Sequence, residues 1–365
     1  MTTPFASRFL VAGLITLAVV APAAVAQQTL TVGPGQPFPT IQAAINAAAP
    51  GDTVLVLAGL YPEALDVGKG IHLVGQGAKL ANSSFNPQIR VHDVPVTQQV
   101  AITGLLLDDT GNNSAVQVVD CPGPVTVRNL GQLGLRQWYV GATAAKQLVV
   151  ASMEIRSANL GNSTTVFHDC TFVPTFPWGI SQNGGGTALV GCTVNAPSIF
   201  LSAGVNLTDG VFAASRSQIH GSSGQSAIQA AAGTVILDPS VQLLPGGSAP
   251  GVGGPVVPLT LEFGTTTAHL TASTLGVHDH GGPPGTAFVT VFSLPAPEVL
   301  TDFGPAWIDL PSCGILQVAT YDAAREHVLS LPVPPLPPGF AIALQSAMFL
   351  PNGPALGTAT VVVAP

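Results

Sequence analysis

Residues 39–77 read PTIQAAINAAAPGDTVLVLAGLYPEALDVGKGIHLVGQG, and this stretch decides the fold. It opens with a short helix, because the Thr40 hydroxyl can accept a backbone N–H in the first turn. Pro50-Gly51 then ends the helix. Between these two signals, apolar residues recur at the spacing of one helix face: Ile41, Ala44, Ile45 and Ala48.

Three short apolar runs follow the helix, at 53–57, 64–67 and 71–74. Turn residues separate them, and there is no room for a crossover helix between them. Such strands suit one coil of a parallel β-helix. The preceding helix would cover the open apolar end of the coil, as the terminal caps of repeat proteins must.

The same stretch carries a family resemblance. The pattern T-I-Q-x-A-I-x-A-A-x-x-G-D-T-V-x-V, then G-x-Y-x-E and I-x-L-x-G-x-G, resembles the first turn of the pectin-lyase-like right-handed β-helix superfamily. Pectin methylesterases and periplasmic copper-accessory repeat proteins begin in this way. The resemblance implies the fold for about 40 residues, and a fold hosts many functions. The catalytic aspartate motifs of the methylesterases and their arginine before Pro-Trp do not occur in the repeat region.

A six-residue pattern recurs after the first turn, with apolar or small residues at its positions 1, 4 and 6. From the copy ending at Ile155, successive copies end 17, 22, 25 and 22 residues further on, the last at Val241. This period fits one coil of three short strands, so we expect about eight or nine coils. Position 4 should form a core ladder of Leu105, Leu130, Met153, Cys170, Cys192 and Ser217. Position 2 should face outward, in a column of Thr103, Arg128, Ala151, His168, Val190 and Ser215.

The chain divides into four segments on this interpretation. Residues 1–26 form a secretory signal, with Arg8 before an apolar core and Ala24-Val25-Ala26 as the cleavage site. Residues 27–244 form the right-handed parallel β-helix, and the Gly/Pro-rich residues 245–258 form a linker. Residues 259–365 form a small β-sandwich, because strand runs there are separated by turns at wider intervals. The fold class is therefore all-β.

Composition limits the partners. Charged residues make up only 8% of the chain and the formal net charge is −8, which disfavours nucleic acid and anionic membranes. The signal predicts a secreted protein, extracellular or periplasmic, with no membrane association after cleavage. We expect a monomer whose partner is a polysaccharide.

Two groups of residues could carry chemistry on that ligand. The resemblance implies that a lyase of this fold would hold Ca²⁺ on aspartates and use a basic residue as base. Asp108 and Asp109 are then the candidate Ca²⁺ ligands, with Asp120 and Arg128 nearby; a polar, solvated turn is the competing interpretation. His168 shares the outward column with Arg128 and is the other catalytic candidate, with a solvated histidine as its alternative.

Other residues could bind a metal or a sugar. His278 and His280 could present two metal ligands from one strand face, but the adjoining Gly281-Gly-Pro-Pro favours a loop and no third ligand is evident, so we expect no metal there. The aromatic residues Trp138, Tyr139 and Trp178 lie in predicted loops and could stack on sugar rings, with rings that fold back over the rod as the alternative.

The four cysteines lack the spacing of a zinc or redox motif. Stacked thiols are favoured over a disulfide for Cys170 and Cys192, and the pairing of Cys121 and Cys313 stays open.

The expected function is binding, with processing left open, of polysaccharide on one face of the rod. The alternative is a non-catalytic surface or structural protein with a β-helix stalk. Ca²⁺ is the one cofactor that the sequence suggests.

Overall fold

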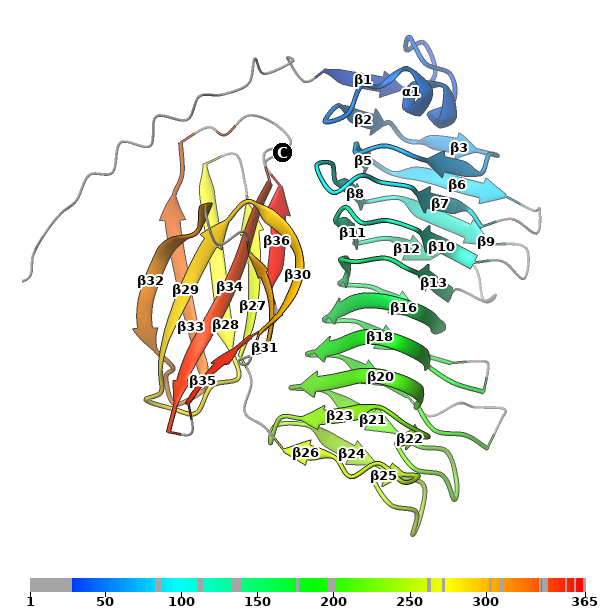
Figure 1. Cartoon of the computed structure of the whole chain (residues 1–365). Helices are drawn as coiled ribbons and strands as arrows, with labels where there is room; N and C mark the ends of the chain where they lie inside the picture. The colour runs from blue at the N-terminus through cyan, green and yellow to red at the C-terminus, as the bar shows by residue number, and fades with distance from the viewer. Residues whose placement is uncertain are drawn as a thin grey trace, which may run out of the picture.

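The structure is a computed structural model. It describes residues 28–363 except 83–86, 110–113, 133–138, 175–176, 196–200, 261–263, 271–272, 302–303, 309–311, 335, 337–340, 352 and 358. The expected secretory signal lies outside the described residues. Figure 1 shows a rod of stacked strands with a second, antiparallel unit lying beside it.

The rod is a parallel β-solenoid of about nine turns between residues 29 and 260, as the sequence predicts. Each turn contributes one strand to each of three faces. Face 1 consists of β1 (Thr29–Val32), β2 (Thr53–Val56), β5 (His72–Gly75), β8 (Val100–Thr103), β11 (Val125–Arg128), β14 (Leu148–Ala151), β23 (Thr234–Leu237) and β26 (Leu259–Thr260).

The other two faces follow in chain order. Face 2 consists of β3 (Gly59–Tyr61), β6 (Ala78–Asn82), β9 (Leu106–Asp109), β12 (Gly131–Gln132), β15 (Glu154–Ile155), β17 (Thr171–Phe172), β19 (Thr193–Val194), β21 (Gln218–His220) and β24 (Gln242–Leu244). Face 3 consists of β4 (Leu65–Val67), β7 (Ile89–His92), β10 (Ser114–Val119), β13 (Tyr139–Thr143), β22 (Ile228–Ala230) and β25 (Val252–Gly253).

Three long strands run from face 3 into face 1 of the next coil without a break: β16 (Ser157–His168), β18 (Ile180–Val190) and β20 (Val205–Ser215). The last coil uses residues that the sequence assigns to a linker, because β25 pairs with β22 and β26 pairs with β23. The solenoid therefore continues to Thr260, past the expected boundary at residue 244.

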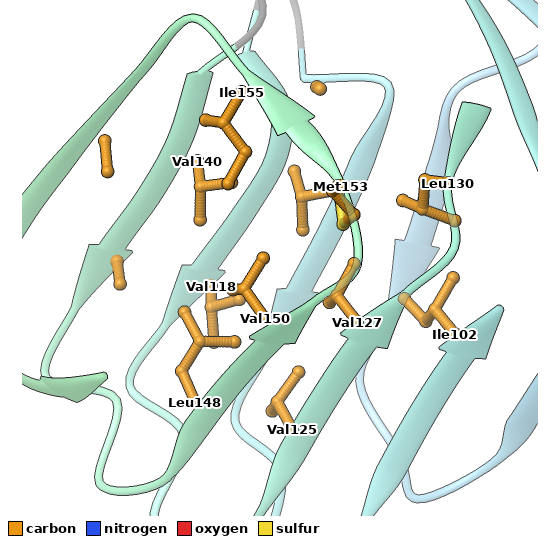
Figure 2. Packing of buried hydrophobic residues seen from close by; sticks show 14 of the residues in the cluster. Ile102, Val118, Val125, Val127, Leu130, Val140, Leu148, Val150, Met153 and Ile155 are labelled. Atoms are coloured by element: carbon orange, nitrogen blue, oxygen red, sulfur yellow. The ribbon is translucent and has the colours of Figure 1, made fainter. Parts of the chain in front are cut away.

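The core consists of the expected ladders of like residues. All six members of the position 4 ladder, from Leu105 to Ser217, are buried. Figure 2 shows Leu130 and Met153 of this ladder beside Val127 and Val150 from the neighbouring strands. Burying one such aliphatic side chain contributes about 1.5–3 kcal/mol.

The expected register fails only at the last repeat copy. Leu237 pairs with Ala214 in the core, so Ile236 faces outward, and Leu243 rather than Val241 pairs with Ile219. One extra residue thus precedes Leu237, and the second lies in the turn after Asp238, where Val241 donates its N–H to the carbonyl of Asp238.

The corner between faces 1 and 2 is made by one residue with positive φ in each of six successive coils. Such backbone suits glycine, and it is tolerated by asparagine and aspartate. These residues directly follow the outward column of position 2: Gly104, Asn129, Ser152, Asp169, Gly191 and Arg216. Arg216, with φ of 51°, is the large member of the series.

The helix α1 (Ile41–Ala47) covers the first coil, as expected, with Ile41, Ala44 and Ile45 buried. Thr40 accepts the N–H of Ala43. A second cap comes from Glu63, whose carboxylate accepts the N–H groups of Ile41 at 2.8 Å and Gln42 at 2.9 Å. The glutamate of G-x-Y-x-E therefore acts here as a helix cap at the positive end of the helix. No described helix is long and apolar enough to cross a membrane.

The C-terminal unit is made of small antiparallel sheets. One sheet is β27 (Thr265–Leu270), β28 (Thr274–His280) and β33 (Glu326–Pro332). The other contains β32 (Gly314–Thr320), β29 (Ala287–Ser293), β34 (Ala341–Leu350), β35 (Gly353–Leu356) and β36 (Thr360–Val363). β30 (Pro295–Thr301) and β31 (Gly304–Ile308) form a separate hairpin.

Apolar and polar contacts join these sheets. Leu275 and Val277 of β28 share a buried cluster with Leu344 of β34. Beside that cluster, the buried carboxylate of Asp279 accepts hydrogen bonds from the Thr266 and Thr290 hydroxyls, both at 2.7 Å. A β-sandwich is thus confirmed.

Candidate functional site

The outward column of face 1 does not face solvent in the second half of the rod. The register confirms the expected column, with Arg128, Ala151, His168, Val190 and Ser215 at successive levels. Four of these column members are buried: Ala151, His168, Val190 and Ser215. The prediction that His168 is a solvated or ligand-accessible histidine is therefore wrong.

The cover over this column is the C-terminal unit. Val166, Ala188 and Val190 on the outer side of face 1 form one buried cluster with Ala359. Further along, Ala213 and Ile236 pack against the buried side chains of Phe288, Tyr321 and Met348. An ion pair joins the two units at the same level, with Arg325 Nη2 lying 3.5 Å from Oδ2 of the buried Asp238.

His168 lies beneath this cover with only 6% of its surface exposed. Neither ring nitrogen has a hydrogen-bond partner among the described residues. Burial, with the positive charge of Arg128 as a smaller cause, lowers the pKa of His168 to about 4. Burial also lowers the pKa of Arg128. His168 is therefore a neutral imidazole at pH 7.

A cluster of polar side chains adjoins His168 at the junction of the two units. His278 and His280 both come from β28, and antiparallel pairing places Glu326 of β33 directly opposite His280. Glu326 Oε2 lies 3.2 Å from His278 Nε2, and Oε1 lies 3.8 Å from His280 Nδ1. The two imidazole rings lie against each other with their centroids 3.7 Å apart and their planes tilted by 40°.

The solenoid contributes a cation to this cluster. Arg216 Nη2 lies 3.1 Å from Glu326 Oε1, and Nη1 contacts His280 Nδ1. Burial lowers the pKa of His280 to about 3, and the charges of His278, Arg216 and His168 act in the same direction. The ring of His280 is therefore neutral, and its Nδ1 accepts a hydrogen bond from the guanidinium of Arg216.

Glu326 is a third potential metal ligand in this cluster, and the sequence alone did not indicate it. His278, His280 and Glu326 each offer one ligand atom, and these atoms lie within 4.8 Å of one another. The expectation of no third ligand is therefore wrong. The antiparallel pairing of β28 with β33 brings Glu326 beside histidines that lie 46 residues or more away in the chain.

The lyase candidates occupy different parts of the rod. Asp108 and Asp109 end β9 on face 2, and the structure describes only their backbone. Asp120 is exposed after the end of β10 on face 3, and Arg128 ends β11 on face 1. The backbone thus spreads the four residues over three faces, so the proton-abstraction site that the resemblance implied gains no support from this arrangement.

Face 3 presents a different outer surface. Its central outward column aligns polar and small residues in register, in the order Asp66, Arg90, Gln117, Gly141, Asn159, Ser181, Asn206 and Gln229. Asn159 and Gln229 are exposed, while Gln117, Ser181 and Asn206 are half-buried. Successive members are about 4.8 Å apart, as in any parallel ladder. The column forms a flat strip of amide and hydroxyl groups that we call the amide strip, from Gln117 to Gln229.

The three candidate aromatic residues fare differently. Trp178 is 40% exposed and lies two residues before β18, at the edge of face 3. Trp138 lies outside the described residues. Tyr139 begins β13 on the same face, and only its backbone is described.

None of the four cysteines is in a disulfide, and Cys121, Cys170 and Cys192 are buried. Cys170 and Cys192 stack one coil apart, as the favoured interpretation expects. The hydrogen bond between these two thiols, together with burial, raises the pKa of Cys170 well above its usual value.

Comparison with known proteins gives this chain no relative by which to assign the site. No family model and no curated protein matches it.

Proposed function

We propose that this is an exported protein that binds a neutral polysaccharide along the amide strip of face 3. The observation that carries the proposal is the register of this face, which aligns the side chains of Gln117, Asn159, Asn206 and Gln229 in one column. Each side-chain amide both donates and accepts hydrogen bonds, as sugar hydroxyl groups do. The strip therefore suits an extended chain of hydroxyl-bearing rings.

Two further features support a neutral ligand. The strip itself carries no charged side chain from Gln117 to Gln229, and the whole chain is only 8% charged. The exposed Trp178 adjoins face 3, where a sugar ring could stack on the indole. The basic residue of the face 3 column, Arg90, lies just beyond the Gln117 end of the strip, beside Asp66, and Arg128 lies on another face.

The test is a glycan-array screen on the chain from Gln27, followed by affinity measurements on the polysaccharide it selects. The double change Asn159→Ala and Gln229→Ala removes two amides from the strip. At about 1 kcal/mol for each lost hydrogen bond, binding should weaken about 30-fold. The matched control is Gln218→Ala, which removes an exposed amide from face 2 instead. Equal weakening by the control, or none by the double variant, would contradict the assignment to face 3.

The second candidate function is a non-catalytic scaffold, in which the rod displays the C-terminal unit. Its supporting observation is the cover over face 1, which buries the outward column from Ala151 to Ser215. A screen that selects no glycan would favour this function over the first.

A further inference from the structure

We propose that His278, His280 and Glu326 form a zinc site at the junction of the solenoid and the C-terminal unit, and that Arg216 occupies it when no metal is bound. This inference is independent of polysaccharide binding on face 3. Two imidazoles and one carboxylate form a donor set that Zn²⁺ uses with a fourth position open to water. Three features of these side chains support a zinc site: their spacing, their orientation and their surroundings.

The spacing suits a small tetrahedral ion. Ligands about 2.1 Å from Zn²⁺ lie about 3.4 Å from one another in a tetrahedron. Here His278 Nε2 and Glu326 Oε2 are 3.2 Å apart, and His280 Nδ1 and Glu326 Oε1 are 3.8 Å apart. All three ligand atoms lie within 4.8 Å of one another, so the widest pair has to approach by no more than about 1.4 Å to reach this separation. The site is built on paired strands, which hold the backbone of all three residues in register.

The orientation of His280 exposes the correct nitrogen. Its Nε2 lies 3.3 Å from the hydroxyl oxygen of Thr267, and that hydroxyl donates to the carbonyl of His278. The Thr267 oxygen is therefore free to accept the N–H at Nε2, which leaves the lone pair of Nδ1 toward Glu326. Such outer contacts fix the tautomer of metal-binding histidines.

The surroundings already attract a cation. The guanidinium of Arg216 contacts Nδ1 of His280 and Oε1 of Glu326, so it uses ligand atoms of two of the three residues. Its side chain is 38% exposed, and those of His278 and Glu326 are 34% and 28% exposed. Arg216 can therefore swing into solvent, and an ion can enter by the same opening.

A second observation points to the same place. His168 is close enough to His280 for their charges to interact, and both of its nitrogens are without a hydrogen bond among the described residues. A buried polar group without a partner is costly. On the solenoid side, a neighbouring imidazole therefore has both nitrogens unsatisfied by the described residues, although His168 is not one of the three proposed ligands.

The experiment is a Zn²⁺ titration of the full chain, purified without a histidine tag, in competition with a chromophoric chelator. We expect one Zn²⁺ per chain. Even changes in outer contacts of zinc sites cost 10- to 100-fold in affinity, so His278→Ala and Glu326→Gln should each weaken binding by more than about 100-fold. The control His220→Ala removes a half-buried histidine on face 2 and should leave the affinity unchanged.

Arg216→Asn is the decisive variant. Asparagine tolerates the positive φ at this corner, as Asn129 does in an equivalent position, so the variant removes the competing guanidinium and keeps the turn. We expect Zn²⁺ to bind this variant at least about 10-fold more tightly than the wild type. Equal or weaker binding by Arg216→Asn would refute the proposal. So would Zn²⁺ binding that persists in His278→Ala, which would indicate an adventitious ion only.

Discussion

Acid should destabilise the native state through its buried histidines, and His168 contributes through a ring that has no hydrogen-bond partner among the described residues. Its pKa is about 4 in the folded protein and about 6.5 when it is exposed by unfolding. Between these values the unfolded chain binds the proton and the folded chain does not. The free energy of unfolding should therefore be unaffected by this residue above pH 6.5, and should fall as the pH drops toward 4.

The magnitude follows from the shift. With these two pKa values, the loss at pH 4 is about 3 kcal/mol relative to pH 7. This is a large fraction of the 5–15 kcal/mol that stabilises a typical domain. Other buried histidines add to the acid sensitivity of the wild type, because burial also lowers the pKa of His72 and of His280. The contribution of His168 must therefore be measured as a difference.

The assay compares wild type with His168→Leu by urea unfolding at pH 7 and pH 4, in the presence of EDTA to keep metal out. Leucine has a similar volume and no ring nitrogens, so the variant should be at least as stable at pH 7. We expect it to lose about 3 kcal/mol less than the wild type between the two pH values. If the two proteins lost the same amount within about 0.5 kcal/mol, the reasoning from burial would be refuted.

Two further predictions concern the cap of α1 and the buried cysteines. Glu63→Ala removes the cap from two backbone N–H groups of α1, so unfolding should become easier by about 1–2 kcal/mol in chemical denaturation, whereas the exposed Glu154→Ala should change it by less than about 0.5 kcal/mol. Thiol titration should modify no more than one cysteine in the native protein and all four after denaturation, because three thiols are buried and none is oxidised; finding only two after denaturation would indicate a disulfide instead. The three buried thiols are Cys121, Cys170 and Cys192.

The solenoid could be predicted from the sequence because each coil pairs with the next one, about one repeat further along the chain. The period near 22 residues matched one coil, and the ladder from Leu105 to Ser217 is buried as expected. The pairing departs from the expected period by one residue at Ile236 and by a second at Val241, in the turn after Asp238. Position 3 of the repeat carries a further local signal for the coil corner, because Gly104, Asn129 and Asp169 are residue types that tolerate positive φ.

The candidate site could not be predicted because it depends on contacts between distant parts of the chain. His168 was placed correctly in the outward column, but no sequence pattern shows that the C-terminal unit covers that column. Glu326 meets His280 only through the pairing of β28 with β33. Arg216 reaches both from the solenoid. The repeat period predicts which residues form the outward column of face 1, but it does not predict which part of the chain packs against that column.

The docked C-terminal unit has a mechanical consequence for the rod. Contacts at Val166, Ala188, Ala213 and Ile236 lie on four successive coils, yet the unit is tethered beyond the last of them, at Thr260. In a bare stack, each coil touches only its neighbours, so coils can peel away one at a time from an end. The C-terminal unit folds back and contacts four coils at once, so none of these coils can separate without breaking contacts with the unit. Pulled from its ends, the rod should therefore yield in this stretch as a single block.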